Sequence, residues 1–167
     1  TLEEFLDAAG DSIRLNIELK PKNEAEAAEL TDRVLEAVRK ADVLGRDRVC
    51  SQSFRAIQTA RNAEPGLEVG SITGAVIGDP TRLDVAFLMV DRRLATRALV
   101  DRASLRGLKI HAWTINNPDH LAALIDDGVS NIITDDVAAV RARLAEIRDL
   151  DPLERILLRV RNNLVGQ

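Results

Sequence analysis

Polar and apolar residues alternate along residues 15–20, LNIELK, and this stretch carries the first candidates for chemistry. Successive side chains of a β-strand point to opposite faces, so the pattern predicts a strand with one apolar and one polar face. Parallel strands that are covered by helices on both sides are normally apolar throughout. The polar face therefore indicates a strand that lines the interior of a barrel, and its members are Asn16, Glu18 and Lys20.

Glu18 has two interpretations that the residues alone leave open. A carboxylate near the C-terminal end of an interior strand suits a divalent metal ion, which prefers oxygen ligands. Alternatively, Glu18 forms an ion pair with Lys20, which lies two residues later on the same face. Carboxylates with unusual surroundings occur both in functional sites and in structural ion pairs.

Residues 110–136 predict a strand–helix–strand unit with polar residues after each strand. Residues 110–114 and 129–134 are the expected strands. Asn117 and Pro118 are typical of a helix start, and Gly128 suits the left-handed position at a helix end. In parallel α/β folds, ligands bind at the edge where the strands end.

Within this unit, Trp113 is the only tryptophan of the chain. A buried tryptophan often serves packing, so core filling is the alternative to a role in binding. Asn116 and Thr134 are interpreted as caps of strand ends. We expect His111 to be packed or at the surface and His120 to be solvated, because the two do not have the spacing of metal ligands.

The rest of the chain predicts strands that alternate with helices, which indicates a parallel sheet of about six β/α units. The expected strands are residues 15–20, 48–53, 67–72, 84–89, 110–114 and 129–134, and the expected helices are residues 1–9, 23–41, 54–62, 94–104 and 137–148.

Composition limits the possible functions. The chain has 167 residues, enough for one core but fewer than the ~250 that a complete eight-stranded β/α barrel typically needs. The net charge of −4 argues against a nucleic-acid partner, which requires clustered Lys and Arg. Cys50 is the only cysteine, so an internal disulfide is impossible. No apolar run is long enough to cross a bilayer.

Two segments carry a resemblance to a known family. WTINNPDHLAALIDDGVSNIITD, residues 113–135, resembles the closing segment of the glycerophosphodiester phosphodiesterases, whose barrels end in a "WTVN…GVDGIITD" signature. TLEEFLDAAG…LNIELK resembles an earlier segment of the same family, in the expected order. The match extends from residue 1 to about residue 142. It implies a partial TIM-type (β/α) barrel of about six parallel β/α units, the third through eighth, which lacks the first two strands.

The resemblance also implies roles for particular residues. LNIELK matches the family's "IEIK", which implies that Glu18 is a metal ligand and Lys20 a phosphate contact. Ser53 and Phe54 match the family's "SSF" strand end, where Phe54 would help to form the pocket wall. The residue that matches Trp113 lines the substrate pocket at the barrel mouth.

Other family motifs do not occur in this sequence. The family's barrel begins with a His-Arg-Gly strand, followed by a Glu-x-Asp pair and a His-Asp pair, which supply the acid and base histidines and the other metal carboxylates. The resemblance therefore implies a fragment of an enzyme that hydrolyses a glycerophosphodiester to an alcohol and glycerol 3-phosphate. We expect this fragment to be inactive alone. The divalent metal of the complete enzyme, Mg²⁺ or Ca²⁺, would not be tightly bound here.

Two alternatives belong to other functional classes. One is a non-catalytic α/β module that keeps the barrel scaffold and serves for association. The other is an open doubly wound sheet that binds a phosphate ligand, although no glycine-rich phosphate loop supports it.

We expect residues 1–149 to form the partial barrel and residues 150–167 a C-terminal amphipathic helix. The tail, LDPLERILLRVRNNLVGQ, resembles the ends of bacterial family members whose catalytic domain follows a multi-span membrane region. This implies a soluble fragment of a membrane-tethered parent. A barrel without two strands cannot close, so strands 15–19 and 130–134 would be free edges, and we predict a homodimer that shields them.

Overall fold

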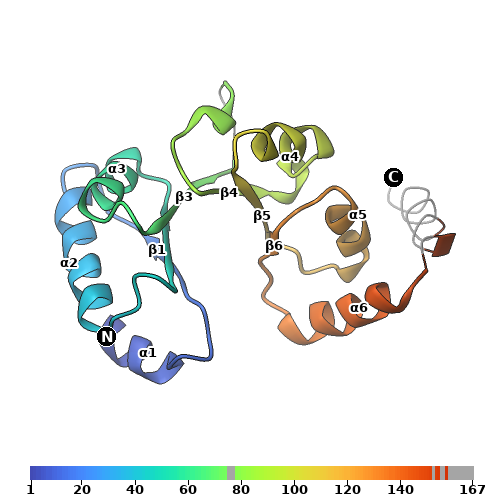
Figure 1. The fold of residues 1–167 in the computed structure, drawn as a ribbon, viewed down its shortest axis with the longest axis horizontal. Coiled ribbons are helices and arrows are strands. Elements are labelled where there is room, and N and C mark those ends of the chain that lie inside the picture. The colour runs from blue at the N-terminus through green and yellow to red at the C-terminus, as the bar shows by residue number, and fades with distance from the viewer. Residues whose placement is uncertain (75–77, 152, 155–156, 158–167) are drawn as a thin grey trace. The chain divides into compact units, whose positions relative to one another are not determined.

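The structure is a computed structural model that describes residues 1–74, 78–151, 153–154 and 157. Its sheet has six strands, which are hydrogen-bonded in sequence order from β1 to β6, and the pairs β1–β2, β2–β3 and β5–β6 are parallel (Figure 1). The strands are β1 (Asn16–Leu19), β2 (Arg48–Ser51), β3 (Glu68–Thr73), β4 (Phe87–Asp91), β5 (Lys109–Trp113) and β6 (Asn131–Ile132).

Helices follow the strands, as the alternating pattern predicts. They are α1 (Leu2–Ala9), α2 (Ala27–Lys40), α3 (Phe54–Ala63), α4 (Arg97–Ser104), α5 (Leu121–Asp126) and α6 (Val137–Asp149). Short 3₁₀ turns occur at Pro80–Arg82, Arg92–Leu94 and Pro118–His120. None of the helices in the described part of the chain is long and apolar enough to cross a membrane.

The chain divides into two compact units. The first comprises Thr1–Thr73 and Arg82–Leu88, and the second comprises Gly74–Thr81 and Met89–Gln167.

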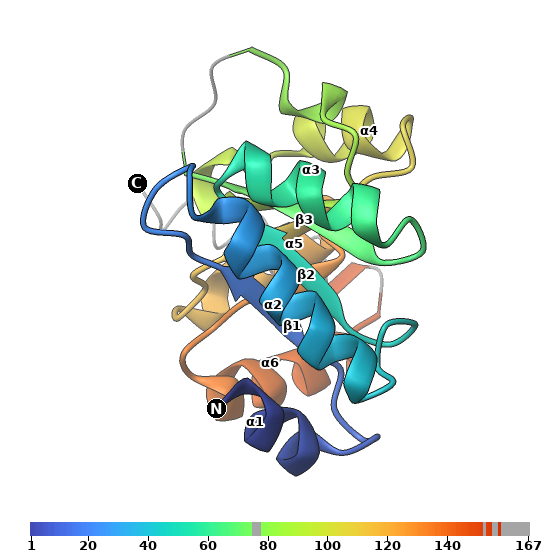
Figure 2. The same cartoon turned by 90° about the vertical axis from the view of Figure 1, so that its left-hand side faces the viewer.

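In the first unit, α2 and α3 cover one face of β1, β2 and β3 (Figure 2). The core between them is built of aliphatic residues: Leu19, Ala27, Leu35, Val49, Ala56, Ile57, Ala60, Leu67 and Val69. A second cluster, Leu6, Ala37, Val38 and Val43, joins α1 to α2. Because side chains alternate along each strand, the residues between the core positions point to the opposite face.

On that opposite face, Glu18, Cys50 and Gly70 lie in register on β1, β2 and β3. The ring of Phe87 fills the space beside Gly70. A Cβ atom at position 70 would lie 2.1 Å from Phe87 Cε2, so only glycine fits here. The Arg48 guanidinium lies 5.8 Å from the centroid of the same ring.

In the second unit, polar side chains cap the helices. Thr96 accepts from the Leu99 amide at the start of α4, Asn117 accepts from the Asp119 amide, and Asp136 accepts from the Ala139 amide at the start of α6. Gly128 has a φ of 88° after α5, as its predicted role at a helix end requires. The buried residues include Leu99, Val100, Ile110, Leu121, Leu124, Val140 and Ile147.

The predicted elements are confirmed in type and order, but several boundaries were wrong. Helix α2 begins at Ala27 rather than at residue 23, because the Asn23 side chain accepts from the amides of Ala25 and Glu26 and holds a separate turn. Strand β4 begins three residues later than predicted, and α4 begins at Arg97 after its Thr96 cap.

Two predictions concern the end of the chain. Strand β6 comprises only Asn131–Ile132, although the Ser130 and Ile133 amides also donate to backbone carbonyls of residues 110 and 112. The amphipathic helix predicted for residues 150–167 lies mostly outside the described residues.

Candidate functional site

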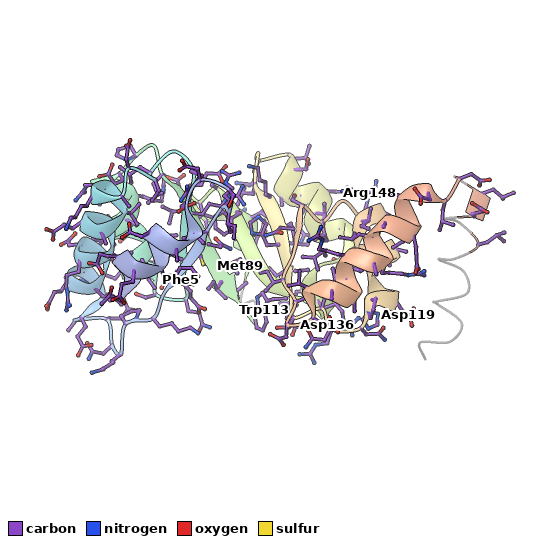
Figure 3. All side chains as sticks on the ribbon, turned by 90° about the horizontal axis from the view of Figure 1, so that it is seen from below. Phe5, Met89, Trp113, Asp119, Asp136 and Arg148 are labelled. Carbon is purple, nitrogen blue, oxygen red and sulfur yellow. The ribbon has the colours of Figure 1, made fainter. Side chains whose placement is uncertain are left out.

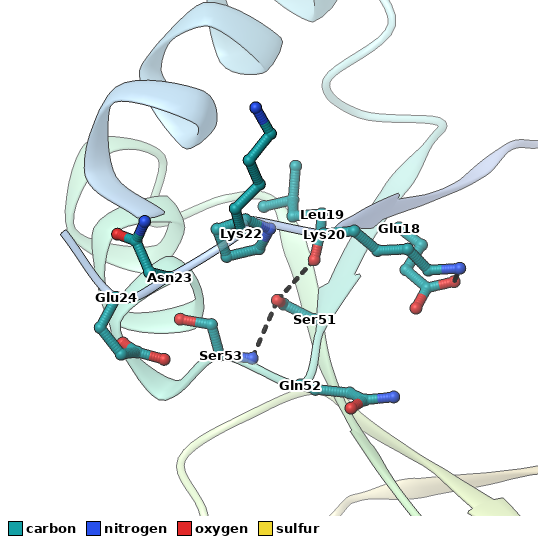
Figure 4. A pocket seen from close by; sticks show the side chains of 10 residues that line it. Glu18, Leu19, Lys20, Lys22, Asn23, Glu24, Ser51, Gln52 and Ser53 are labelled. Atoms are coloured by element: carbon teal, nitrogen blue, oxygen red, sulfur yellow. Dashed lines mark hydrogen bonds and ion pairs between the residues drawn. The ribbon is translucent and has the colours of Figure 1, made fainter. Parts of the chain in front are cut away.

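A cavity of about 380 Å³ lies at the C-terminal ends of β1 and β2, in the first unit (Figure 4). It is lined by residues 18–24 and 51–53. Both Glu18 and Lys20 line it, so the structure brings together the two candidates that the alternating strand predicts. Figure 4 shows their side chains on one side of the pocket, with Asn23 and Glu24 on the other.

The loops around this cavity are held by their own hydrogen bonds. Ser51 Oγ donates to the Leu19 carbonyl at 2.7 Å and accepts from the Ser53 amide at 3.0 Å. Ser53 Oγ accepts from the Ala56 amide at 3.1 Å and so caps α3. The Asn23 amide donates to Glu26 Oε1 at 3.2 Å, while its oxygen accepts from backbone amides. These side chains therefore shape the cavity rather than face a ligand with free groups.

Glu18 and Lys20 form the ion pair that one interpretation of the sequence predicts. Lys20 Nζ lies 3.1 Å from Glu18 Oε2, and the side chains are 75% and 33% exposed, respectively. Ion pairs in contact with solvent contribute little to stability, because water screens them and ordering long side chains costs entropy. The lysine is therefore held in a weak pair and can exchange its partner.

The donor set tests whether these residues fit a divalent metal ion. Mg²⁺ and Ca²⁺ take six or more oxygen ligands, usually with several from the protein or its substrate. Among the residues that the structure describes, no group of three or more His, Cys, Asp or Glu side chains is placed to hold a metal ion. Glu18 supplies one carboxylate, which is paired with Lys20, so the described residues do not form a complete metal site.

Cys50 lies beside Glu18 in the neighbouring strand, at the same register. Burial raises the pKa of its thiol to about 12, the negative charge of Glu18 adds to this shift, and Lys20 opposes it. Because the thiolate is the reactive form of cysteine, this side chain is not a nucleophile at neutral pH.

Phe54 is the first residue of α3, and its side chain is 57% exposed. It lines a different cavity, of about 330 Å³, together with Ile57 and with Arg61, which pairs with Asp84 at 2.5 Å. The structure therefore does not bring Phe54 into the cavity of Glu18 and Lys20, and its contact with a substrate stays a prediction.

Trp113 ends β5 in the second unit and is half-buried (Figure 3). Its six-membered ring packs near Gly74, where an added Cβ atom would lie 3.6 Å from Trp113 Cη2. The indole Nε1 is buried and has no hydrogen-bond partner within the described residues. The ring therefore packs against this turn, and its contact with a substrate stays a prediction.

Asn116 and Thr134 act as caps of strand ends in the second unit. Asn116 Nδ2 donates to Asp135 Oδ2 at 2.8 Å, and Asn116 Oδ1 accepts from the Asp135 amide at 3.0 Å and from Thr134 Oγ1 at 3.3 Å. The interpretation of Asn116 and Thr134 as strand-end caps is therefore confirmed.

His111 is packed in β5 with 1% exposure. His120 is half-buried rather than solvated, and burial and Arg92 lower its pKa while Asp119 opposes them.

Several lining residues, among them Lys22 and Gln52, received no role in the interpretation of the sequence. A signal for Gln52 existed, because it follows Cys50 at the two-residue spacing of a strand, as Lys20 follows Glu18. No comparable signal marks Lys22, which lies in a turn.

Known proteins resemble this chain in sequence. The profile of the glycerophosphoryl diester phosphodiesterase family matches residues 1–139. A relative from Mycobacterium tuberculosis, named "Probable glycerophosphodiester phosphodiesterase 2", is 30% identical over 156 residues, which cover 81% of this chain and 56% of the relative. The chain thus spans little more than half the length of this relative.

Solved structures share the fold. A glycerophosphodiester phosphodiesterase from Parabacteroides distasonis aligns with a TM-score of 0.79 and 21% identity, over 89% of this chain and 63% of that protein. A phosphodiesterase from Oleispira antarctica, in complex with its product sn-glycerol-3-phosphate, aligns with a TM-score of 0.78 and 22% identity, over 87% of this chain and 61% of that protein. The predicted fold class, a partial TIM-type (β/α) barrel, is confirmed.

The family profile extends from α1, through the strand that carries Glu18 and Lys20, to the first residues of α6. Because it matches well over half of the chain, the protein belongs to the glycerophosphoryl diester phosphodiesterase family.

Proposed function

We propose that the cavity at the ends of β1 and β2 binds the phosphate group of a glycerophosphodiester, with Lys20 as its contact. One observation carries this proposal: the Lys20 ammonium lies at the cavity in an ion pair that is largely open to solvent. Because such a pair is worth little, a phosphate can replace Glu18 as the partner of the lysine at a small cost. The ammonium offers a phosphate a compact positive charge and three donors.

Family membership supports the reaction of the complete protein, which is metal-dependent hydrolysis of a glycerophosphodiester to an alcohol and glycerol 3-phosphate. The product bound to the Oleispira relative supports glycerol phosphate as the ligand class. Phe54 and Trp113 are each proposed as a further contact of the substrate, as the family resemblance implies. Both are partly exposed, and each lies beside the C-terminal end of a strand.

Glu18 is proposed as one ligand of Mg²⁺ or Ca²⁺ in the complete enzyme, where the ion would polarise the phosphoryl oxygens. The single carboxylate, without two further clustered ligand residues in the described part of the chain, supports the proposal that this chain is inactive alone. The check is an assay on glycerophosphocholine with either ion. Turnover that survives repurification would contradict it.

A second candidate function is a non-catalytic module that keeps the barrel scaffold and serves for association. Its sheet offers surfaces for this, because β1 and β6 end the strand order and unpaired strand edges invite pairing with another chain. We propose a two-fold homodimer that shields these edges. Sedimentation at micromolar concentration tests it, and a monomer with protected amides in both strands would contradict it.

The tail supports a further part of the proposal, namely that the parent protein is tethered to a membrane. Residues 150–167 resemble the ends of bacterial family members that carry a membrane region, although most of them lie outside the described residues.

The phosphate proposal is tested by titrating the ¹⁵N-labelled chain with sn-glycerol 3-phosphate and following amide shifts. We expect Lys20→Ala to weaken binding by roughly three- to tenfold, the range for one exposed charge-assisted hydrogen bond. The matched control is Lys40→Ala, which removes an exposed lysine from the last turn of α2 and should leave binding unchanged. Equal affinities of Lys20→Ala and wild type would refute the assignment.

A further inference from the structure

Gln52 follows β2 directly and lines the same cavity as Glu18 and Lys20. The register pairs Glu18 with Cys50, and its continuation by two residues brings Gln52 alongside Lys20, on the face that carries Glu18. In Figure 4 the Gln52 side chain extends toward the side of the pocket where Glu18 and Lys20 lie, away from Asn23 and Glu24.

The side-chain amide of Gln52 is available for a ligand, unlike the polar side chains of its neutral neighbours. Ser51, Ser53 and Asn23 all use their polar atoms in the bonds that hold the loops. Gln52 is exposed, and its side chain makes no hydrogen bond within the described part of the chain. The cavity thus combines the weakly held ammonium of Lys20 with the uncommitted carboxamide of Gln52.

The two groups suit different parts of a ligand. Phosphate oxygens only accept hydrogen bonds, and an ammonium only donates them, so Lys20 fits the phosphate. A hydroxyl group both donates and accepts, and a carboxamide has one acceptor oxygen and two N–H donors, so Gln52 fits hydroxyl groups.

We infer that Gln52 binds the glycerol hydroxyls of a ligand whose phosphate lies on Lys20, and thereby selects glycerol phosphates over simple alkyl phosphates. This inference rests on the proposed phosphate site and names the determinant of its specificity. Gln52 touches the part of the ligand that distinguishes glycerol, whereas Lys20 touches the part that all phosphate esters share.

The test compares sn-glycerol 3-phosphate with n-propyl phosphate, which has the same carbon chain and phosphate but no hydroxyls. In NMR titrations of the ¹⁵N-labelled chain, we expect wild type to prefer glycerol 3-phosphate by roughly two- to tenfold, the value of one or two net hydrogen bonds. The side-chain amide signals of Gln52 should shift with glycerol 3-phosphate and not with propyl phosphate.

Gln52→Leu should bind glycerol 3-phosphate only as well as propyl phosphate, and its affinity for propyl phosphate should match that of wild type. The matched control is Gln58→Leu, the same change at an exposed glutamine that lines the other cavity, and it should keep the preference. If thermal melting shows that Gln52→Leu is misfolded, Gln52→Met, which is close to glutamine in length, repeats the measurement.

Each outcome separates the two proposals. A preference that persists in Gln52→Leu, or that wild type lacks, overturns the inference and leaves the phosphate site standing. Weaker binding of both ligands in Lys20→Ala, with the preference lost only in the Gln52 variants, supports both. Wild type that binds neither ligand refutes the phosphate site, and the inference falls with it.

Discussion

The two ends of strands β1 to β3 in the first unit use their charged residues in opposite ways. At the N-terminal end, Asp47 has 2% exposure and both of its oxygens are bonded. Asp47 Oδ1 accepts from the Leu15 amide and from Arg46 Nε, each at 2.9 Å, and Oδ2 accepts from Arg46 Nη2 at 3.2 Å. The carboxylate therefore links the start of β1 to the turn before β2.

Further ion pairs surround this end of the strands. Glu68 at the start of β3 pairs with Arg48 of β2 and with Arg14, whose Nη2 lies 3.4 Å from Glu68 Oε2. Arg14 also donates to the Arg46 carbonyl at 2.5 Å, and Arg46 Nη1 lies 3.1 Å from Asp11 Oδ1. The charges of the N-terminal end thus satisfy one another and the backbone.

At the C-terminal end, several polar groups are less committed. Glu18 and Lys20 share a single exposed pair, and the Gln52 amide has no protein partner among the described residues. Buried polar groups that are paired stabilise a fold, whereas solvent-exposed polar groups remain able to bind a ligand. The N-terminal end therefore stabilises the unit, and the C-terminal end carries the groups that we propose bind a ligand.

The largest effect is expected for Asp47→Ala, which should lower the free energy of unfolding by about 3 kcal/mol, since it leaves partly buried donors of Leu15 and Arg46 without an acceptor. Urea denaturation measures it. Asp32→Ala, at an exposed position of α2, is the matched control and should change stability by no more than about 0.5 kcal/mol. Equal effects of the two substitutions would show that the bonds of Asp47 do not stabilise the fold.

Acid should remove part of this contribution. Burial raises the pKa of Asp47, but the hydrogen bonds from Arg46 and Leu15 and the charges of Arg46 and Arg14 outweigh it, so the pKa lies below its ordinary value of 3.8. A lowered pKa gives stability that is complete above the unfolded-state value and is lost as the pH falls through the folded-state value. The stability gap between wild type and Asp47→Asn should therefore narrow as the pH falls below about 4.

Unfolding curves of both proteins from pH 7 downward measure this gap. A gap that stays constant, or that widens in acid, would show that the carboxylate charge of Asp47 does not stabilise the unit.

A smaller loss of about 1–2 kcal/mol is expected for Glu68→Gln, because Glu68 is partly exposed and an amide oxygen can still accept one of the arginine bonds. Thermal melting measures the loss, with Glu36→Gln on the exposed side of α2 as the control. A loss no larger than that of the control would mean that the ion pairs of Glu68 do not stabilise the fold.

The contrast between the two ends also explains what the sequence could predict. The alternation in LNIELK is a local signal, and it correctly predicted which face of β1 carries Glu18 and Lys20. The network around Asp47 had no such signal, because a charged triplet between a helix and a strand is typical of a solvated loop. Asp47 is buried by partners that include the Leu15 amide, 32 residues away.

The site could be predicted only in part for a related reason. Sequence spacing identifies side chains that share a strand face, but it does not show whether a carboxylate meets a lysine or a metal ion. It also places Phe54 beside Ser53 without showing that the side chain turns to another cavity. Helix starts such as that of α2 depend on whether a side chain like Asn23 caps the helix or a preceding turn.

The smallest effect on stability is expected at the C-terminal end, for Glu18→Gln. The substitution removes the pair with Lys20, which is exposed to solvent, so the free energy of unfolding should change by less than about 1 kcal/mol. The same variant tests the metal proposal. Because Glu18 is one carboxylate without a cluster of further ligands in the described residues, we expect calorimetry to show binding of Mg²⁺ or Ca²⁺ to wild type no tighter than millimolar. Micromolar binding that disappears in Glu18→Gln would show that this chain completes a metal site. A loss of stability as large as that of Asp47→Ala would show that Glu18 belongs to the fold rather than to the site.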